Sequence, residues 1–583
     1  MSSGEPRRSY WRWGKKDFYP ESSFENLSSY RKAVAQTLPR LKDRLLARSS
    51  DAQELIECRK ESENEMKKCL TWWDLIWLSF GNVVGSGIFS ITGLEAHNHA
   101  GPAIVVAYAI SGFSAMLSAL CYTEFSVEIP VAGGSFSFLR IELGDFVAFT
   151  AAGNLLLEAV VGAAGLGRAW SSYFASIVKN DPDFLRIRAA SLPEGFNMLD
   201  PLAVFVLLAT CAFAMSGTRR TSILNWLSSI LTSLVIVVII VIGFLHSNTH
   251  NLRPFFPYGP KGVFQAASVV YWSYTGFDLV ATMAEETKNP ARDIPIGLVG
   301  SMSMITVVYC LMSLALVMMQ KYTEIDINAP YSVAFQSIGM KWAKYVVSIV
   351  ALKGMTTSLM VGSLGQARYI TQIGRAHMIP PWFALVHPKT GTPINGALLV
   401  TILGAVFCFF SSLDVLSSVF SFSTLFIFML MAVALLVRRY YVALDTPKGD
   451  HLRFLAFLFI IIASSIGIAA FWNLSDGWVG YAVCGVILFL GTLGMQLVPQ
   501  RRSAKIWGVP FVPWVPSISI AMNIFLIGSL GADAFWRFFV CFGAMIVYYL
   551  LAGLHATYDV AHQTNEAVVA EEGKAADAAS SAS

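Results

Sequence analysis

Two short stretches of the 583-residue sequence place glycines and hydrogen-bonding side chains inside long apolar segments. Residues 81–89 read Gly-Asn-Val-Val-Gly-Ser-Gly-Ile-Phe, and residues 271–278 read Tyr-Trp-Ser-Tyr-Thr-Gly-Phe-Asp. A helix interrupted within lipid leaves N–H and C=O groups that must line a cavity or bind a ligand. Free N–H groups at the start of a half-helix suit a carboxylate, and free carbonyls suit an ammonium group. Together the two stretches predict a receptor for a zwitterionic amino-acid backbone.

A purely structural explanation also exists for the first stretch. Gly81 and Gly85 are four residues apart, a spacing that allows two membrane helices to pack closely. The pairing of the two stretches favours binding instead, because they fall in the first and sixth predicted helices. Those positions begin the two halves of a five-plus-five inverted repeat, which is typical of secondary transporters.

Three ionisable residues lie inside or beside apolar segments, where an unpaired charge is costly. We expect Glu158 to recognise a positively charged group of a substrate; the alternative is a structural ion pair with Arg168. Lys353 is a candidate for proton coupling, since a lysine held away from water can exchange protons near neutral pH. It could equally replace a bound sodium ion or snorkel to the interface. Asp278 either caps a half-helix or pairs with Lys353.

The elements that must position these residues are membrane helices. Hydrophobic residues make up 55% of the chain and charged residues 14%, whereas soluble proteins carry about a quarter charged residues. This composition argues against a soluble enzyme, and the net charge of +4 resides largely in polar ends and loops, which argues against a nucleic-acid partner. Because a helix needs about 20 apolar residues to cross the bilayer, we predict an all-α polytopic membrane protein with about fourteen spans. They cover residues 74–96, 100–125, 145–178, 201–216, 222–246, 263–285, 296–319, 342–374, 394–410, 415–437, 454–472, 478–498, 512–530 and 534–555.

Basic residues in the short loops place both termini in the cytoplasm. Residues 27–45 alternate apolar and basic residues at near-helical spacing. They predict a basic amphipathic helix, which either lies along the inner leaflet or docks on the cytoplasmic loops of the bundle. Four regions follow: a cytoplasmic tail (1–70), a ten-helix transport core (71–437), four additional helices (438–555) and a disordered tail (556–583).

Motifs of catalysis are missing from the sequence. It contains no His-Glu-x-x-His pattern and no phosphate-binding glycine-rich loop. We therefore expect no enzymatic activity, no cofactor and no metal, and a gradient must supply the driving force.

Several further motifs, in a fixed order, resemble the cationic amino acid transporter family of the amino acid-polyamine-organocation superfamily, most closely its plant members. They are Gly-Ser-Gly-Ile-Phe at 85–89, Glu-Ile-Pro-Val-Ala-Gly-Gly-Ser-Phe at 128–136, Gly-Phe-Asp at 276–278 leading into Ala-Glu-Glu-Thr-Lys-Asn-Pro at 284–290, Leu-Gly-Gln-Ala-Arg at 364–368 and Gly-Thr-Pro at 391–393. The resemblance covers residues 70–555 and implies a transport core with discontinuous helices 1 and 6, followed by four extra helices.

The resemblance also implies roles for individual residues. The N–H groups of Ser86 and Gly87 would hold the substrate carboxylate, and Phe277 would close over the ligand as a gate. The α-amino group would be held by carbonyls of Val83, Trp272, Ser273 and Thr275. Proton-coupled relatives carry a lysine in span 5 where this chain has Thr232, which leaves the coupling site open. At the cytoplasmic end, we expect Glu285, Glu286, Lys288, Arg292 and Asp293 to form a gate network with Arg368 and Arg375.

The expected function is import of cationic amino acids, L-arginine and L-lysine, by alternating access, driven by protons or by the membrane potential. The plasma membrane is the expected location, with the vacuolar membrane as the alternative. No disulfide-linked heavy chain is expected, because residues 179–200 contain no cysteine. A carrier of neutral amino acids, of a broad range of amino acids or of polyamines, and a non-transporting amino-acid sensor, remain alternatives.

Overall fold

The computed structural model describes residues 10, 14–45, 47–48, 70–129, 134–179, 183–193, 195–215, 218–281, 283, 287–388, 390–442, 445–474 and 477–562. Nearly all regular structure in these residues is helical, apart from one short antiparallel pair, β1 (Ile187–Arg188) and β2 (Met198–Leu199). The helices before the middle of the chain are α1 (Lys15–Phe18), α2 (Leu27–Ala35), α3 (Thr37–Leu45), α5 (Trp72–Val83), α6 (Ser86–Glu95), α7 (Ile104–Glu128), α8 (Gly134–Leu143), α9 (Asp145–Lys179), α10 (Pro201–Met215), α11 (Thr218–Leu245), α12 (Gly259–Val270) and α13 (Asp278–Ala281). The later helices are α14 (Pro290–Met319), α15 (Pro330–Ser337), α16 (Lys341–Arg375), α17 (Ile394–Phe410), α18 (Leu413–Tyr440), α19 (Lys448–Leu474), α20 (Trp478–Gln496), α21 (Trp514–Ser529) and α22 (Ala532–Tyr548).

The prediction of an all-α polytopic membrane protein is confirmed. Each of the fourteen predicted ranges contains a described helix, and eight described helical segments are long and apolar enough to cross a membrane. Shorter apolar helices, such as α10, α17 and α21, occupy other predicted spans. The apolar runs fold as helices because a helix satisfies its own backbone hydrogen bonds inside lipid.

The first and sixth spans are both interrupted, as the glycine-containing stretches predict. Helix α5 ends at Val83, and Val84 and Gly85 leave helical geometry before α6 begins at Ser86. Helix α12 ends at Val270 and continues as a 3-10 turn, Tyr271–Tyr274. Thr275 is then extended, and Gly276 has a φ of +105°, a conformation that favours glycine. Each break therefore occurs where glycine relaxes the backbone.

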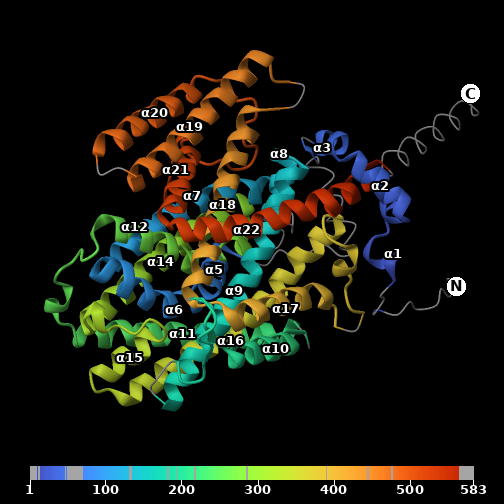
Figure 1. Cartoon of the computed structure of the whole chain (residues 1–583). Helices are drawn as coiled ribbons and strands as arrows, with labels where there is room; N and C mark the ends of the chain where they lie inside the picture. Colours follow the sequence, from blue (N-terminus) through green and yellow to red (C-terminus); the bar gives the residue numbers. More distant parts are fainter. Residues whose placement is uncertain are drawn as a thin grey trace, which may run out of the picture.

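Helix α9 runs through the centre of the bundle and packs against α16, α17 and α18 (Figure 1). Helix α14 lies on the other side of the breaks, where it packs against α5 and α7. Helices α19, α20 and α21 form a separate group that joins the rest through contacts of α21 with α18 and α7. The two interrupted helices thus lie between the α9–α16 group and α14.

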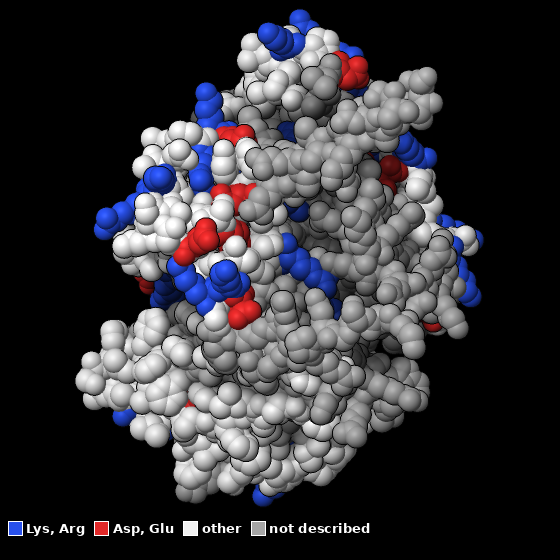
Figure 2. Space-filling model, turned by 90° about the vertical axis from the view of Figure 1, so that its right-hand side faces the viewer, with Lys and Arg blue, Asp and Glu red and all other residues white. Residues whose placement is uncertain are grey.

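The N-terminal segment, α1 to α3, docks on one end of the bundle. Phe18 stacks on Trp382 of the α16–α17 connection, with 5.0 Å between ring centroids. The Arg40 guanidinium pairs with Asp559, and Arg44 pairs with Asp145 at the start of α9. Charged side chains gather on this end, which faces the viewer in Figure 2. Of the two alternatives for residues 27–45, these contacts show docking on the bundle. Leu38, one of the apolar residues in this range, nevertheless remains 79% exposed.

The prediction of a disordered tail from residue 556 onward is wrong for its first seven residues. The helical chain that follows α22 continues to residue 562, because Asp559 accepts hydrogen bonds from Ser22 and Ser23 of the docked N-terminal segment. Residues 563–583 lie outside the described part of the chain.

Candidate functional site

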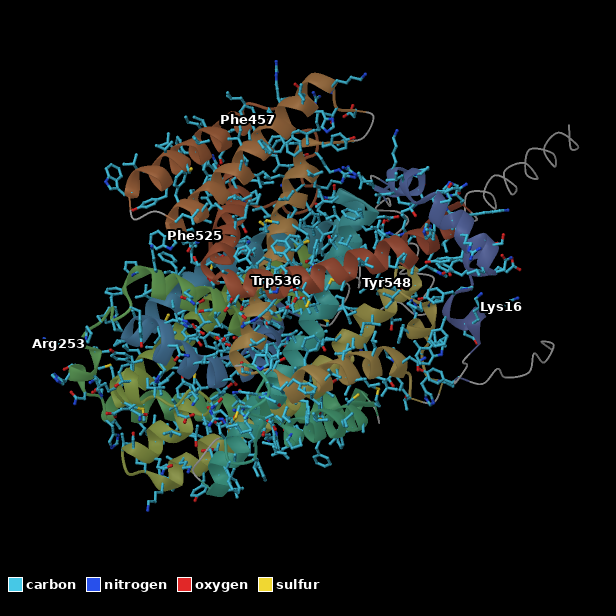
Figure 3. All side chains as sticks on the ribbon, in the orientation of Figure 1. Lys16, Arg253, Phe457, Phe525, Trp536 and Tyr548 are labelled. Carbon is cyan, nitrogen blue, oxygen red and sulfur yellow. The ribbon has the colours of Figure 1, made fainter. Side chains whose placement is uncertain are left out.

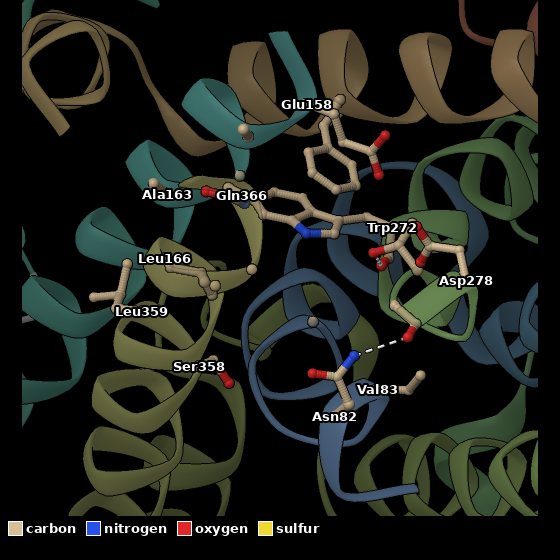
Figure 4. A pocket seen from close by; sticks show the side chains of 18 of the residues that line it. Asn82, Val83, Glu158, Ala163, Leu166, Trp272, Asp278, Ser358, Leu359 and Gln366 are labelled. Carbon is tan, nitrogen blue, oxygen red and sulfur yellow. Dashed lines mark hydrogen bonds between the residues drawn. The ribbon is translucent and has the colours of Figure 1, made fainter. Parts of the chain in front are cut away.

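A cavity of about 170 Å³ opens between the two helix breaks (Figure 4). Its walls come from α5, α6, α9, the α12–α13 break, α16 and α18. The lining includes Val83, Gly87, Glu158, Trp272, Ser273, Thr275 and Asp278 among the predicted site residues. The structure therefore brings both breaks and both acidic residues to one cavity.

The start of α6 supplies the donor side of the cavity. Because α6 begins at Ser86, the N–H groups of Ser86 and Gly87 belong to the first helical turn, which has no acceptor inside the helix. The helix dipole adds about half a positive charge at this end. Gly87 lies so close to the second break that a Cβ at this position would come within 2.6 Å of Ser273 Cα. Glycine is thus required for the two breaks to meet.

The acceptor side consists of carbonyls that already have partners within the protein. The Tyr309 hydroxyl of α14 lies 3.1 Å from the Val83 carbonyl oxygen and 2.9 Å from that of Ser273. The Trp272 carbonyl accepts from the Thr275 N–H and hydroxyl. A carbonyl oxygen has two lone pairs. The Val83 and Ser273 oxygens, each with the Tyr309 hydroxyl as partner, therefore keep capacity for a further donor such as an ammonium group, whereas the Trp272 oxygen already accepts twice.

A second tether joins the breaks directly. Asn82 of α5 donates its side-chain amide to the Gly276 carbonyl at 2.8 Å, as the dashed line in Figure 4 shows. Tyr309 and Asn82 therefore hold the unwound parts of the first and sixth spans in register. Sequence reasoning did not assign either residue a role, although Asn82 lies within the first glycine-containing stretch.

Two carboxylic acids, Glu158 and Asp278, face the cavity. They are close enough to interact electrostatically, and the Tyr369 hydroxyl donates to Asp278 at 3.4 Å. Among the described residues that line the cavity, none is Lys, Arg or His. A cavity with this charge pattern suits a cation.

The alternative of an ion pair between Glu158 and Arg168 is wrong. Arg168 is 1% exposed and its guanidinium donates to backbone carbonyls, those of Cys408 at 2.9 Å and of Met198. Ten residues separate Arg168 from Glu158 along α9, and the guanidinium has turned toward the connections at the far end of α9. Glu158 therefore faces the cavity without this partner.

Trp272 is the aromatic side chain that the second break contributes to the cavity. Its indole stacks on Phe420 of α18 with 4.8 Å between centroids. Phe277, the predicted gate, is fully buried and packs against Tyr122 and Phe428, and it does not line the cavity. Its role as a gate remains a prediction that requires the side chain to move.

Lys353 lies on α16, half-buried and outside the cavity lining. The neighbouring Gly354 packs against α11, where a Cβ would lie 3.7 Å from the Thr232 hydroxyl. Lys353 therefore adjoins in sequence the residue of α16 that packs near Thr232, and its coupling role remains a prediction. Asp278 begins α13. In the predicted gate network, Glu285 and Glu286 lie outside the described residues.

Helix α16 supplies a cavity wall that sequence reasoning missed. Ser358, Gly362, Gln366 and Tyr369 line the cavity at spacings of three to four residues. This small and polar face within a long membrane helix is a helical-period signal, and it could have been found in the sequence.

Comparisons with known proteins agree with this geometry. A family model described as amino acid permease matches residues 70–492, and one described as the C-terminus of such permeases matches residues 507–557. Cationic amino acid transporter 8, vacuolar, of Arabidopsis thaliana is 70% identical over 96% of this chain and 95% of its own length. Cationic amino acid transporter 5 of the same plant is 62% identical over 95% and 98%, respectively. The methylthioribose transporter of Bacillus subtilis is 32% identical over 66% of this chain and 84% of its own length. The chain therefore belongs to the cationic amino acid transporter family of the amino acid-polyamine-organocation superfamily.

Proposed function

We propose that the protein carries cationic L-amino acids, such as arginine and lysine, across a membrane by alternating access. The observation that carries the proposal is the cavity between the helix breaks, which combines a helix N-terminus with two acids and no described basic side chain. Membership of the amino acid permease family and the names of the plant relatives support the same substrate class.

Each part of the substrate has a counterpart in this arrangement. The carboxylate would accept from the N–H groups of Ser86 and Gly87, and the α-ammonium would donate to the carbonyls of Val83 and Ser273. The cationic side chain would extend toward Glu158. A pair of unit charges 4 Å apart gains about 4 kcal/mol at an effective dielectric constant of 20. A neutral side chain gains no such term, so the two acids favour arginine and lysine over glutamine.

The membrane potential supplies part of the driving force in this proposal. Moving one positive charge across the membrane is worth about 2.3 kcal/mol per 100 mV, so a cationic substrate can be accumulated by the potential alone. Protons are a second possible source of energy, and Lys353 and Asp278 remain the coupling candidates from the sequence.

The orientation and the membrane are also part of the proposal. We propose that both termini lie in the cytoplasm, because basic residues are concentrated in the short loops on the same side of the membrane. Helices α1 to α3 and Lys16 lie at the end of the molecule opposite Arg253 (Figure 3). The relative with 70% identity is named vacuolar, which supports the vacuolar membrane over the plasma membrane. In either membrane, the end near Arg253 would face the non-cytoplasmic compartment.

Counterflow in proteoliposomes tests this function. Vesicles loaded with unlabelled arginine should take up labelled arginine, and lysine should compete better than glutamine or putrescine. The absence of counterflow would favour a sensor, whereas stronger competition by putrescine or glutamine would favour a polyamine or neutral amino acid carrier.

The variant Glu158→Gln tests the charge of the cavity. Loss of a charge-assisted contact worth about 1.5–3 kcal/mol should raise the KM for arginine by about ten- to a hundredfold and should weaken the preference for lysine over glutamine. Glu324→Gln removes an exposed carboxylate outside the cavity and serves as the control. An unchanged substrate preference in Glu158→Gln would contradict a recognition role for Glu158.

A further inference from the structure

A buried acid and a histidine form a pair at the end of α6, away from the substrate cavity. The Glu95 side chain is 0% exposed, and its Oε2 lies 2.9 Å from Nδ1 of His99. The other carboxylate oxygen, Oε1, is buried without a hydrogen-bond partner among the described residues. The His99 ring is 24% exposed, so protons can reach the pair while Glu95 remains sealed.

The second nitrogen of the His99 ring reaches the other interrupted helix. Nε2 of His99 lies 3.1 Å from the amide nitrogen of Gln265 on α12. An amide nitrogen only donates, so Nε2 must accept and the ring proton must reside on Nδ1, from which it is donated to Glu95. The neutral imidazole therefore links the turn that follows α6, residues Ala96–Ala100, to the middle of α12. Helices α6 and α12 are the two helices that adjoin the substrate breaks.

A proton added to Nε2 changes this bridge. The imidazolium donates from both nitrogens, so Nε2 then faces the Gln265 amide as donor against donor. The hydrogen bond between His99 and Gln265 is lost unless the amide turns over, while the ion pair of His99 with Glu95 is strengthened. One proton thus exchanges a link between the two interrupted helices for a link within the first of them.

We propose that His99, held by Glu95 and Gln265, is a proton-binding site through which the non-cytoplasmic compartment controls the separation of α6 and α12 and thereby couples protons to transport. This inference rests on the proposed transport function. The site is distinct from Lys353 and Asp278, because it lies at the opposite end of the sixth span from α13 and beside the start of α12.

Other titratable groups surround the pair. Asp414 at the start of α18 is close enough to interact electrostatically with both Glu95 and His99. The other titratable groups near this turn, on the elements packed against it, include His97, Tyr108, Tyr258, Lys261, Tyr322 and Glu324; those of α7 beyond Tyr108 lie toward its other end, at Cys121, Tyr122, Glu124 and Glu128. His97 has a different partner, since its Nδ1 lies 2.9 Å from the Ile325 carbonyl oxygen, and it therefore provides a matched control.

The test is arginine counterflow at several outer pH values with the membrane potential clamped. The parent protein should show a rate that changes over about pH 5 to 8, the range in which histidine titrates, and His99→Gln should lose this dependence. Gln265→Glu replaces the donating amide by a carboxylate that accepts a hydrogen bond from the protonated ring. The midpoint of the pH dependence of the counterflow rate should therefore rise by about one pH unit or more. His97→Gln should keep the parent profile.

The outcomes separate this inference from the proposed function. Absence of arginine counterflow at every pH would overturn both. Two results would overturn the proton site alone: a counterflow rate in the parent protein that does not change with outer pH, or a His99→Gln variant whose rate depends on pH as in the parent. If His99→Gln does not fold, Gln265→Glu decides, because an unmoved midpoint in that variant also overturns the site.

Discussion

Gly165 of α9 shows how a single residue sets the shape of the cavity. A Cβ at this position would lie 2.1 Å from the tip of the Trp272 indole, so only glycine lets the ring lie flat against Phe420. The ring in turn covers one side of the space that Glu158 faces. The sequence around residue 165 is rich in Ala and Gly and does not reveal which of these residues has this function.

We predict that Gly165→Ala displaces Trp272 and raises the KM for arginine. Overpacking of this kind costs about 1–3 kcal/mol, which corresponds to an increase in KM of roughly five- to a hundredfold in the uptake assay. Gly485→Ala is the matched control, because a Cβ at residue 485 meets nothing within 4 Å. In the double variant Gly165→Ala, Trp272→Phe, the smaller phenyl ring should restore part of the affinity for arginine. A KM equal to that of the parent in Gly165→Ala alone would refute the packing argument.

At the scale of elements, the two interrupted spans act together because α14 joins them. The Tyr309 hydroxyl occupies the same two carbonyls, those of Val83 and Ser273, that are expected to meet the substrate ammonium. This hydroxyl is a hydrogen-bond partner for two carbonyl oxygens that lack a helical N–H partner at the breaks. Substrate can then add to them without first breaking a helix.

We predict that Tyr309→Phe lowers the melting temperature of the substrate-free protein and increases the stabilisation by arginine. Two buried acceptors lose their donor, at a cost of about 1–3 kcal/mol, and a bound ammonium group would satisfy them. Thermal unfolding in detergent, with and without arginine, measures both effects. Tyr108→Phe removes another buried hydroxyl, which hydrogen-bonds to the Thr92 hydroxyl at 2.8 Å and not to these two carbonyls, and serves as the control. Equal arginine shifts in the two variants would show that Tyr309 does not act through these carbonyls.

At the scale of the whole molecule, polar contacts attach the connection before α21 to the bundle and join the N-terminal segment to the C-terminal helical segment. Glu124 at the end of α7 pairs with Arg439 of α18 and also accepts from the Val509 N–H, so it fixes the connection before α21. Asp559 accepts from the Ser23 N–H at 2.7 Å and pairs with Arg40 at 3.3 Å. One carboxylate near the far end of the chain therefore contributes to the docking of the N-terminal segment, together with the Arg44–Asp145 pair and the Phe18–Trp382 stack.

We predict that Asp559→Ala releases the N-terminal segment while the transport core stays folded. Loss of hydrogen bonds to a charged group, worth about 1.5–3 kcal/mol, should increase amide hydrogen exchange in residues 22–45 by about ten- to a hundredfold. Asp533→Asn changes an exposed acid at the start of α22 and should leave exchange unchanged. Parent-like protection in Asp559→Ala would mean that the apolar contacts hold the segment without this carboxylate.

The sequence alone determined the helical class, the approximate spans and the two helix breaks. Each of these depends on local composition, since apolar length dictates a membrane helix and glycine near mid-span dictates where it can unwind. The order of the motifs also identified the family. Glu158 was found for a similar reason, because a carboxylate inside an apolar run is conspicuous without any structure.

Only the tertiary structure decided which side chains meet. Tyr309 contacts Val83, 226 residues earlier in the chain, and Ser273, 36 residues earlier, and Gln265 contacts His99 across 166 residues. It is also the packing of α9, α14 and α18 that turns Arg168 and Phe277 away from the cavity. Such contacts depend on the relative rotation and depth of whole helices, which arise from packing summed over many residues and leave no mark in the local sequence.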